Sequence, residues 1–193
     1  MNLYNLHSKP ESLDHHDHAQ DSVPSIVWEK YRDDPAELKK REALFAKDAK
    51  YAYQYARYAL KGRFPVGEAA IAKDPEHAFM YAQYVIQSRF PAGEAAIAAD
   101  AYKSCQYALY VLRGRFPAGE AAIATDAYQS CNYALHVLKD RFPAGEAAIA
   151  TDSSESLTYA EWVLKDRFPA GEAAIAKDPE YAKEYNTFIS KLK

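Results

Sequence analysis

The chain has few cysteines, the residues that could cross-link it through disulfide bonds. Its 193 residues include two cysteines, Cys105 and Cys131, which excludes the disulfide framework of small secreted domains. They lie 26 residues apart. At that interval they would sit on successive stacked helices about 8–10 Å apart, whereas a disulfide needs Cα atoms within about 7 Å. We therefore expect both to be reduced, small core residues.

Long apolar runs and a dominant charge are also lacking. No run approaches the roughly 18 apolar residues of a membrane span, and residues 1–21 have no apolar signal core, so we expect a cytoplasmic protein and no membrane partner. The formal net charge is −3. Residues 1–36 carry three cations and seven anions, which leaves the rest near neutral. Without a basic footprint, nucleic acid is not an expected partner.

The chain is rich instead in copies of one block. Arg-Phe-Pro begins at positions 63, 89, 115, 141 and 167, each time followed by Gly-Glu-Ala-Ala-Ile-Ala after one residue. A fixed period of 26 residues is typical of stacked supersecondary units. The sequence therefore predicts an all-α solenoid of about six helix pairs.

One repeat can be assigned from its local signals. Pro65 suits the first turn of a short helix that ends near residue 72, and Asp74 suits the N-cap of a longer helix that runs to about Gln87. In the longer helix, one buried stripe is predicted at Ala78, Tyr81, Ala82, Val85 and Ile86. Gly62 and Gly114 occupy the places where a left-handed C-terminal cap would be favoured.

The ends of the array are marked by departures from the pattern. Residues 37–39 replace Arg-Phe-Pro with Glu-Leu-Lys, and the last long helix turns polar. We therefore expect an irregular polar arm at 1–21 and a single solenoid domain at 22–193. Within that domain, 22–48 form an N-terminal cap and degenerate first unit, 49–177 the regular repeats, and 178–193 a C-terminal capping helix.

An arginine and a glutamate recur in each block and are the first candidates for chemistry. Five equal copies argue against one catalytic constellation, so the pairs are interpreted as a structural linker clamp, with ligand contact as the alternative. The pairs are Arg63 and Glu68, Arg89 and Glu94, Arg115 and Glu120, Arg141 and Glu146, and Arg167 and Glu172.

Two aromatic columns follow the same period. An invariant tyrosine column is expected in the core, with hydroxyls bonded across repeats; it comprises Tyr55, Tyr81, Tyr107, Tyr133, Tyr159 and Tyr185. A second column changes identity and either packs between repeats or forms a partly exposed ladder of binding anchors; it comprises Tyr58, Tyr84, Tyr110, His136, Trp162 and Phe188. A variable polar column beside it is where specificity would reside.

Metal and nucleotide signals are weak. His15, His16 and His18 lie among aspartates, which predicts a solvated polar arm or, alternatively, a weak metal site without a tetrahedral signature. The single glycine of each block does not make a phosphate-binding loop. No cofactor is expected.

The repeat resembles the short two-helix repeats of uncharacterised proteins from tailed bacteriophages and other large viruses. The similarity covers about residues 33–193 and is carried by Tyr55-Ala56, Ala59-Leu60-Lys61-Gly62-Arg63-Phe64-Pro65, Gly67-Glu68 and Ile71-Ala72-Lys73-Asp74-Pro75. It implies a viral origin and an accessory role in the host cytoplasm. Ala101, Ala127 and Ser153 depart from its proline.

These observations favour a non-enzymatic protein that binds another protein. With the resemblance, the leading expectation is a phage accessory protein that inhibits or redirects a host factor, such as a defence or nucleic-acid-processing enzyme. The alternatives are a viral structural or assembly component and a protein that sequesters a small ligand or nucleotide. No enzyme is expected, because no nucleophile has a partnered base and no metal set is complete.

Overall fold

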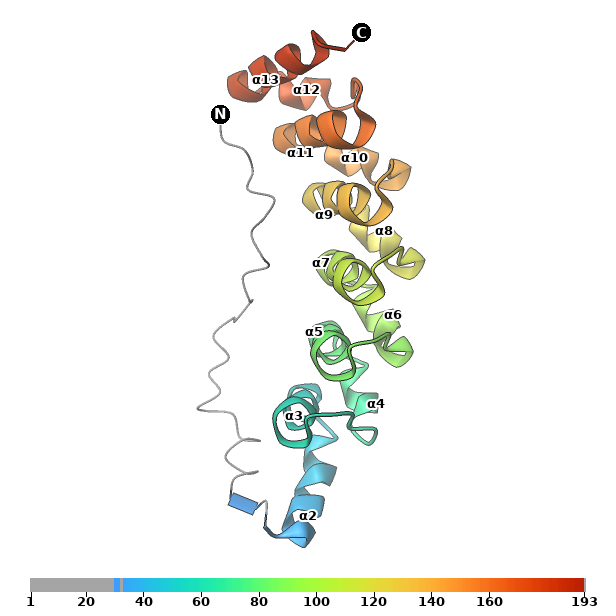
Figure 1. Cartoon of the computed structure of the whole chain (residues 1–193), viewed down its shortest axis with the longest axis vertical. Coiled ribbons are helices and arrows are strands. Elements are labelled where there is room, and N and C mark those ends of the chain that lie inside the picture. Colours follow the sequence, from blue (N-terminus) through green and yellow to red (C-terminus); the bar gives the residue numbers. More distant parts are fainter. Residues whose placement is uncertain (1–29, 32, 193) are drawn as a thin grey trace.

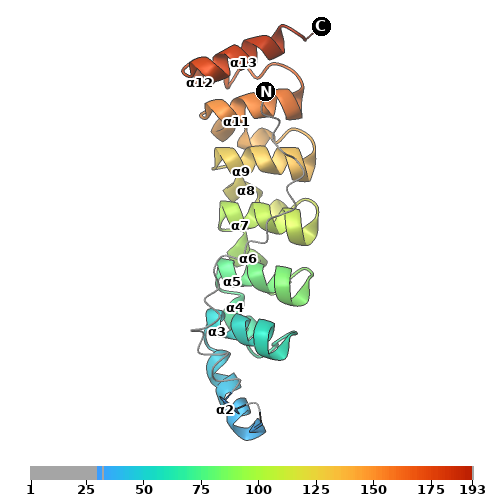
Figure 2. The ribbon, with the colours of Figure 1, turned by 60° about the vertical axis from the view of Figure 1, so that its left-hand side comes forward.

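The computed structural model describes residues 30, 31 and 33–192, and these form a gently curved rod of stacked helix pairs (Figure 1). The predicted all-α solenoid is confirmed. Each repeat has a short helix and a long one, and the long helices are stacked side by side along the rod (Figure 2). Figure 1 shows the long helices along the inner side of the curve and the short helices along the outer side.

The array begins with α2 (Pro35–Phe45), a single helix capped by Asp34, whose carboxylate accepts the N–H groups of Ala36 and Glu37. The short helices that follow are α4 (Glu68–Ile71), α6 (Glu94–Ile97), α8 (Glu120–Ile123), α10 (Glu146–Ile149) and α12 (Glu172–Ile175). Three of them are preceded by 3₁₀ turns, namely η3 (Pro91–Gly93), η5 (Pro117–Gly119) and η7 (Pro143–Gly145). Proline thus opens the short helical segment in these repeats, as the sequence predicts.

The long helices begin as α-helices and, except for the last, finish as π-helices. The α segments are α3 (Ala49–Gln54), α5 (Pro75–Met80), α7 (Ala101–Gln106), α9 (Ala127–Asn132) and α11 (Ser153–Thr158). The π turns are η1 (Tyr55–Leu60), η2 (Tyr81–Ile86), η4 (Tyr107–Leu112), η6 (Tyr133–Leu138) and η8 (Tyr159–Leu164). The final long helix, α13 (Pro179–Ile189), is α-helical throughout. Each α segment starts at its predicted aspartate N-cap; for example, Asp74 accepts the N–H of His77.

The expected glycine caps are wrong. No described glycine has a positive φ, and the left-handed residue is the one before, at Lys61, Gln87, Arg113, Lys139 and Lys165. The π turn supplies the reason: the carbonyl of Ala56 accepts the N–H groups of both Lys61 and Gly62, so the chain already reverses at Lys61. None of the five is β-branched, which keeps this conformation accessible.

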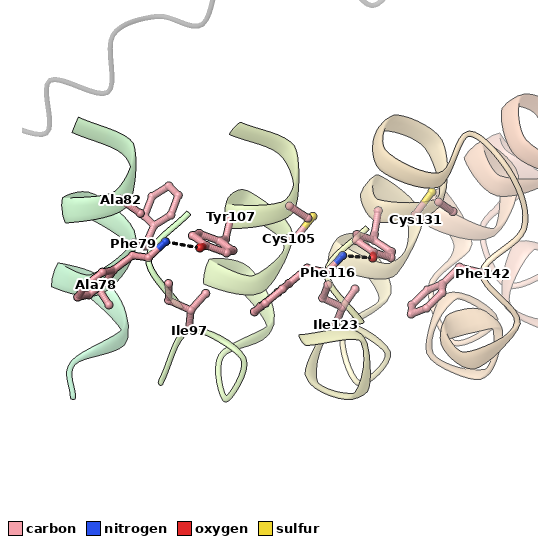
Figure 3. Packing of buried hydrophobic residues seen from close by; sticks show 14 of the residues in the cluster. Ala78, Phe79, Ala82, Ile97, Cys105, Tyr107, Phe116, Ile123, Cys131 and Phe142 are labelled. Carbon is pink, nitrogen blue, oxygen red and sulfur yellow. Dashed lines mark hydrogen bonds between the residues drawn. The ribbon is translucent and has the colours of Figure 1, made fainter. Parts of the chain in front are cut away.

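The core lies between the two layers and repeats with the sequence. Ile97 of α6 and Tyr107 and Ala108 of η4 are fully buried. Five of the core tyrosines, from Tyr55 to Tyr159, also pack edge-on against the phenylalanine of the linker that follows; the ring centroids of Tyr107 and Phe116 are 5.1 Å apart at 64°. Figure 3 shows this packing continuing from one repeat to the next.

The last helix closes the array with polar side chains. Lys183 occupies the column that holds buried Cys105, Cys131 and Leu157 in earlier repeats, and it is exposed. Asn186 and Ser190 are exposed as well. In the part of the chain that the structure describes, no helix has the length and apolar character needed to cross a bilayer.

The glycine of each Gly-Glu pair is needed for close packing. A Cβ at Gly119 would lie 2.6 Å from both Cδ1 of Phe116 and Cβ of Ser104. Ser104 is fully buried, and its hydroxyl donates to the carbonyl of Ile97 at 2.9 Å, so neither neighbour can move freely.

We therefore predict that Gly119→Ala lowers the free energy of unfolding by about 2 kcal/mol through overpacking. Gly114→Ala is the matched control, because its Cβ would meet only the carbonyl oxygen of Leu112 at 3.9 Å. Denaturant unfolding of the two variants checks this. Equal losses of stability would show that the contact with Phe116 and Ser104 is not the cause.

Candidate functional site

The recurrent arginine and glutamate lie together in all five copies. In the first copy, Arg63 donates from Nε and Nη2 to the two carboxylate oxygens of Glu68 at 2.9 and 3.0 Å. The other four pairs have the same bidentate geometry, with distances of 2.8 to 3.0 Å. Bidentate pairs of this kind fix orientation as well as adding energy. The five pairs thus tie each linker to the short helix that follows it.

A tyrosine of the next long helix completes each network. The hydroxyl of Tyr81 donates to Oε1 of Glu68 at 2.8 Å and accepts the backbone N–H of Phe64 at 2.8 Å. The same two bonds recur four times, through Tyr107, Tyr133, Tyr159 and Tyr185. Figure 3 draws two of the hydroxyl bonds as dashed lines. Each core tyrosine hydroxyl therefore ties its long helix to the linker that leaves the preceding long helix. The bond joins neighbouring long helices, although both partners lie within one unit counted from Arg-Phe-Pro, so the expected bonds across repeats are found only in this sense.

The electrostatics of the network are those of a paired structural site. The arginine holds the pKa of Glu94, Glu146 and Glu172 below the ordinary value of 4.5. Burial raises the pKa of Tyr107 and Tyr133 to about 12. Because the network is repeated with the same partners, no copy stands out as a unique constellation, and the linker-clamp interpretation is compatible with every polar contact named above.

The second aromatic column lies on the inner, long-helix side of the rod. Tyr84, Tyr110 and Trp162 are 38%, 41% and 58% exposed. His136 is exposed too, whereas Tyr58 is half-buried. All of these residues lie in π turns, which occur frequently at functional sites. The column is therefore partly exposed to solvent, as the binding-ladder alternative requires.

Two further exposed tyrosines lie on the same side of the long helices, and the sequence analysis did not identify them. Tyr102 and Tyr128 are 40% and 56% exposed and lie near the start of α7 and α9. They precede the ladder residues Tyr110 and His136 by eight residues, or about two helical turns. The available signal was that the other repeats carry Lys50, Glu76, Ser154 and Glu180 at this position, which marks it as solvent-facing.

We name the surface built from these positions the inner face. It comprises the outward column of Lys50, Glu76, Tyr102, Tyr128, Ser154 and Glu180, the variable polar column of Gln54, Met80, Gln106, Asn132, Thr158 and Glu184, the flanking column of Arg57, Gln83, Leu109, Leu135, Glu161 and Thr187, and the aromatic ladder. The buried residues of the same helices, such as Ser104 and Ala108, face the short-helix layer.

Charge is unevenly spread along the inner face. Lys50 and Arg57 lie at its N-terminal end, and the guanidinium of Arg57 sits 5.1 and 4.7 Å from the ring centres of Tyr58 and Tyr84. Such cation–π contacts hold the two rings in place. One repeat further on, Lys103 forms an ion pair with Glu76, which neutralises both.

The C-terminal end of the inner face is acidic and hollowed. A depression of about 410 Å³ there is lined by Glu161, Glu180, Glu184, Lys183, Lys191 and Phe188 among others. Burial raises the pKa of Glu161, and the negative charge of Glu184 raises it further. Between the two charged ends, α7, η4, α9 and η6 present tyrosine, glutamine, asparagine, leucine and histidine to the face.

The cysteines are buried, and both are free thiols. Burial raises the pKa of Cys105 to about 11 and also raises that of Cys131. Such thiols are poor nucleophiles, and the expectation of small reduced core residues agrees with this placement.

The weak metal candidate cannot be placed. His15, His16 and His18 lie outside the described residues, as does the rest of the expected arm at 1–21. Among residues 30, 31 and 33–192 no cluster of three or more histidine, cysteine, aspartate or glutamate side chains could hold a metal ion.

Comparisons with protein-family models, with curated proteins and with solved structures each find no match to this chain.

The hydrogen bonds of the core tyrosines predict that removing one hydroxyl oxygen lowers the stability of the fold. Tyr133→Phe removes the acceptor of the buried Phe116 N–H and the donor to Glu120. We expect a loss of about 2 kcal/mol in unfolding free energy, because a buried polar group is left unpaired. Tyr128→Phe, at an exposed site, should leave the unfolding free energy unchanged. Denaturant unfolding of both variants measures the difference, and a Tyr133→Phe chain as stable as wild type would contradict the network.

The lowered pKa of Glu94, Glu146 and Glu172 predicts acid sensitivity. Between the ordinary pKa of 4.5 and the lower folded value, the unfolded chain binds more protons, so stability falls as pH drops through this window. Thermal unfolding from about pH 7 to about pH 3 should show a falling melting temperature. Arg141→Gln should reduce the acid dependence, since Glu146 then loses the cation that lowers its pKa. If the melting temperature of Arg141→Gln depended on pH as that of wild type does, the acid sensitivity could not be assigned to the arginine–glutamate pairs.

Proposed function

We propose that this chain is a non-enzymatic binding protein whose inner face holds a protein partner. The observation that carries the proposal is the clustering of exposed aromatic side chains. Among the described residues, the exposed large aromatic side chains are Tyr84, Tyr102, Tyr110, Tyr128 and Trp162, and all five lie on the inner face. Tyrosine and tryptophan dominate the residues that carry binding energy in protein interfaces.

The division of each repeat into fixed and variable residues also supports a binding function for the inner face. The residues that never vary between repeats are used in the linker network, in the core or as N-caps, which leaves the variable columns free to contact a partner. The face combines rigid aromatic rings with the short amides of Gln106 and Asn132, a mixture also found in antibody combining sites. Stacked repeats commonly present such extended concave surfaces to partners.

We also propose which kind of protein the partner is. The resemblance to phage repeat proteins makes a bacterial host protein in the cytoplasm the first partner to seek, with inhibition or redirection of that protein as the consequence. This step is supported by the Tyr-Ala, Arg-Phe-Pro and Gly-Glu motifs of the sequence.

The test compares wild type with a chain carrying Tyr110→Ala and Trp162→Ala. Both side chains are about half exposed, so the substitutions should change the free energy of unfolding by less than about 1 kcal/mol. We expect them to reduce by more than about tenfold the affinity for a protein that wild type retains from bacterial lysate. Quantitative mass spectrometry of the retained proteins, followed by calorimetric titration, measures this.

Val66→Ala is the matched control, because Val66 is 68% exposed but lies in the linker before α4. It should retain the same proteins as wild type. If the Tyr110→Ala, Trp162→Ala chain loses stability but binds its partner normally, the ladder is packing and the proposed face is wrong.

A further inference from the structure

The uncharged side chains of the inner face are arranged symmetrically about the middle of the array. The long helices of the face run from α3 to α13, so its midpoint falls between α7 and α9. Tyr102 and Tyr128 lie on either side of this midpoint in the outward column, and Leu109 and Leu135 do so in the flanking column. The two halves of the centre therefore carry the same kinds of side chain.

The charges of the face have the opposite symmetry about the same midpoint. Lys50 of α3 and Glu180 of α13 are both exposed and end the outward column at its two extremes. Arg57 adds a second cation near Lys50, and Glu184 a second carboxylate near Glu180. In the depression at the acidic end, glutamates outnumber lysines by three to two. Each charged end of the face therefore has its counterpart at the other end.

A face of this kind is complementary to a copy of itself turned end for end. A two-fold axis that runs parallel to the helices, between α7 and α9, lays α3 of one copy over α13 of the other. Lys50 then faces Glu180 at both ends. Glu76, whose helix lies over that of Glu161, is already paired with Lys103. The parallel arrangement would instead bring Lys50 to Lys50 and Glu180 to Glu180, so the charges select the antiparallel one.

The dimensions of the face match those of a stable dimer interface. The α7 and η4 segments have six residues each, which makes this long helix about 18 Å long. Five steps of about 9 Å separate α3 from α13, so the face extends over about 45 Å. The product is about 800 Å² per copy, the size of a standard protein–protein interface.

The shape of the rod places the charged ends first in contact. The long helices lie along the inner side of a gentle curve (Figure 1). Two such faces meet first at their ends, where opposite charges lie, and the exposed rings of Tyr102, Tyr110 and Tyr128 occupy the space at the centre. An unrelated partner would not require the face to match itself, so this symmetry points to a second copy as its occupant.

We propose that two copies of this chain pair through their inner faces, antiparallel and related by a two-fold axis between α7 and α9, when no other protein occupies the face. The inference goes beyond the proposed function, because it gives the inner face an occupant that a partner has to displace.

Sedimentation equilibrium of the full-length chain tests the pairing. At concentrations up to about 100 μM, wild type should reach twice the mass of one chain. The Tyr110→Ala, Trp162→Ala chain should have a dimer dissociation constant at least about tenfold higher, because it lacks two rings of the face.

Charge reversal tests the direction of the pairing. A dimer of the Lys50→Glu chain has like charges at both ends, and so has a dimer of the Glu180→Lys chain. Each substitution should raise the dissociation constant about tenfold, since the two-fold axis repeats the contact. In an equimolar mixture of the two variants, a mixed dimer has opposite charges at both ends, so its dissociation constant should lie within about threefold of wild type.

Lys73→Glu is the matched control, because Lys73 is exposed but follows α4 in the short-helix layer. It should leave the dissociation constant unchanged. A mixture of the Lys50→Glu and Glu180→Lys chains that dimerises no better than either variant alone would overturn the antiparallel pairing.

The other outcomes separate this inference from the proposed function. A wild-type chain that stays monomeric overturns the pairing, while the proposed function stands if a lysate protein binds in a Tyr110- and Trp162-dependent manner. A wild-type chain that dimerises but retains no lysate protein supports the pairing and removes the proposed function. If the Tyr110→Ala, Trp162→Ala chain dimerises and binds lysate proteins as wild type does, the inner face is wrong and both proposals fail.

Discussion

The backbone N–H of the phenylalanine in each linker has to be paired in a place where water does not reach it. Phe116 is 2% exposed, and its N–H donates to the hydroxyl of Tyr133, which belongs to the next long helix and is itself fully buried. The same hydroxyl donates to Glu120, which Arg115 holds from the solvent side. The linker that leaves one long helix is therefore paired only when the next long helix is in place. Stacking thus follows from hydrogen bonding as well as from apolar burial.

This arrangement separates the residues that build the rod from those that are free to bind. The repeated block uses its arginine, phenylalanine, proline, glycine and glutamate to build the linkers and short helices. These residues are therefore not available to a partner. The long helices bury one side against them and leave the opposite side to vary, where Tyr110, His136 and Trp162 follow each other along one column. The side-chain oxygen of Gln54, in the variable polar column, is buried without a hydrogen-bond partner, which costs stability.

Much of this could be predicted from the sequence, because the period of 26 residues, the aspartate caps and the proline positions are local signals. The π turns could not. Tyr185 is anchored through the same two bonds as Tyr107, yet α13 stays α-helical, so the recurrent tyrosine does not mark the turn, and the left-handed caps were assigned one residue late. The ladder was found because it repeats. Tyr102 and Tyr128 were missed because only two repeats carry an aromatic side chain there, and the unpaired oxygen of Gln54 can be recognised only from its surroundings.

Amide hydrogen exchange at the linker phenylalanines tests the central interaction most directly. The N–H groups of Phe64, Phe90, Phe116 and Phe142 lie in linkers outside any helix, yet each donates to a buried tyrosine hydroxyl. The account predicts that these amides exchange as slowly as those in the middle of the long helices, because they open only when neighbouring long helices separate. Exchange at the rate of an unprotected loop would contradict it.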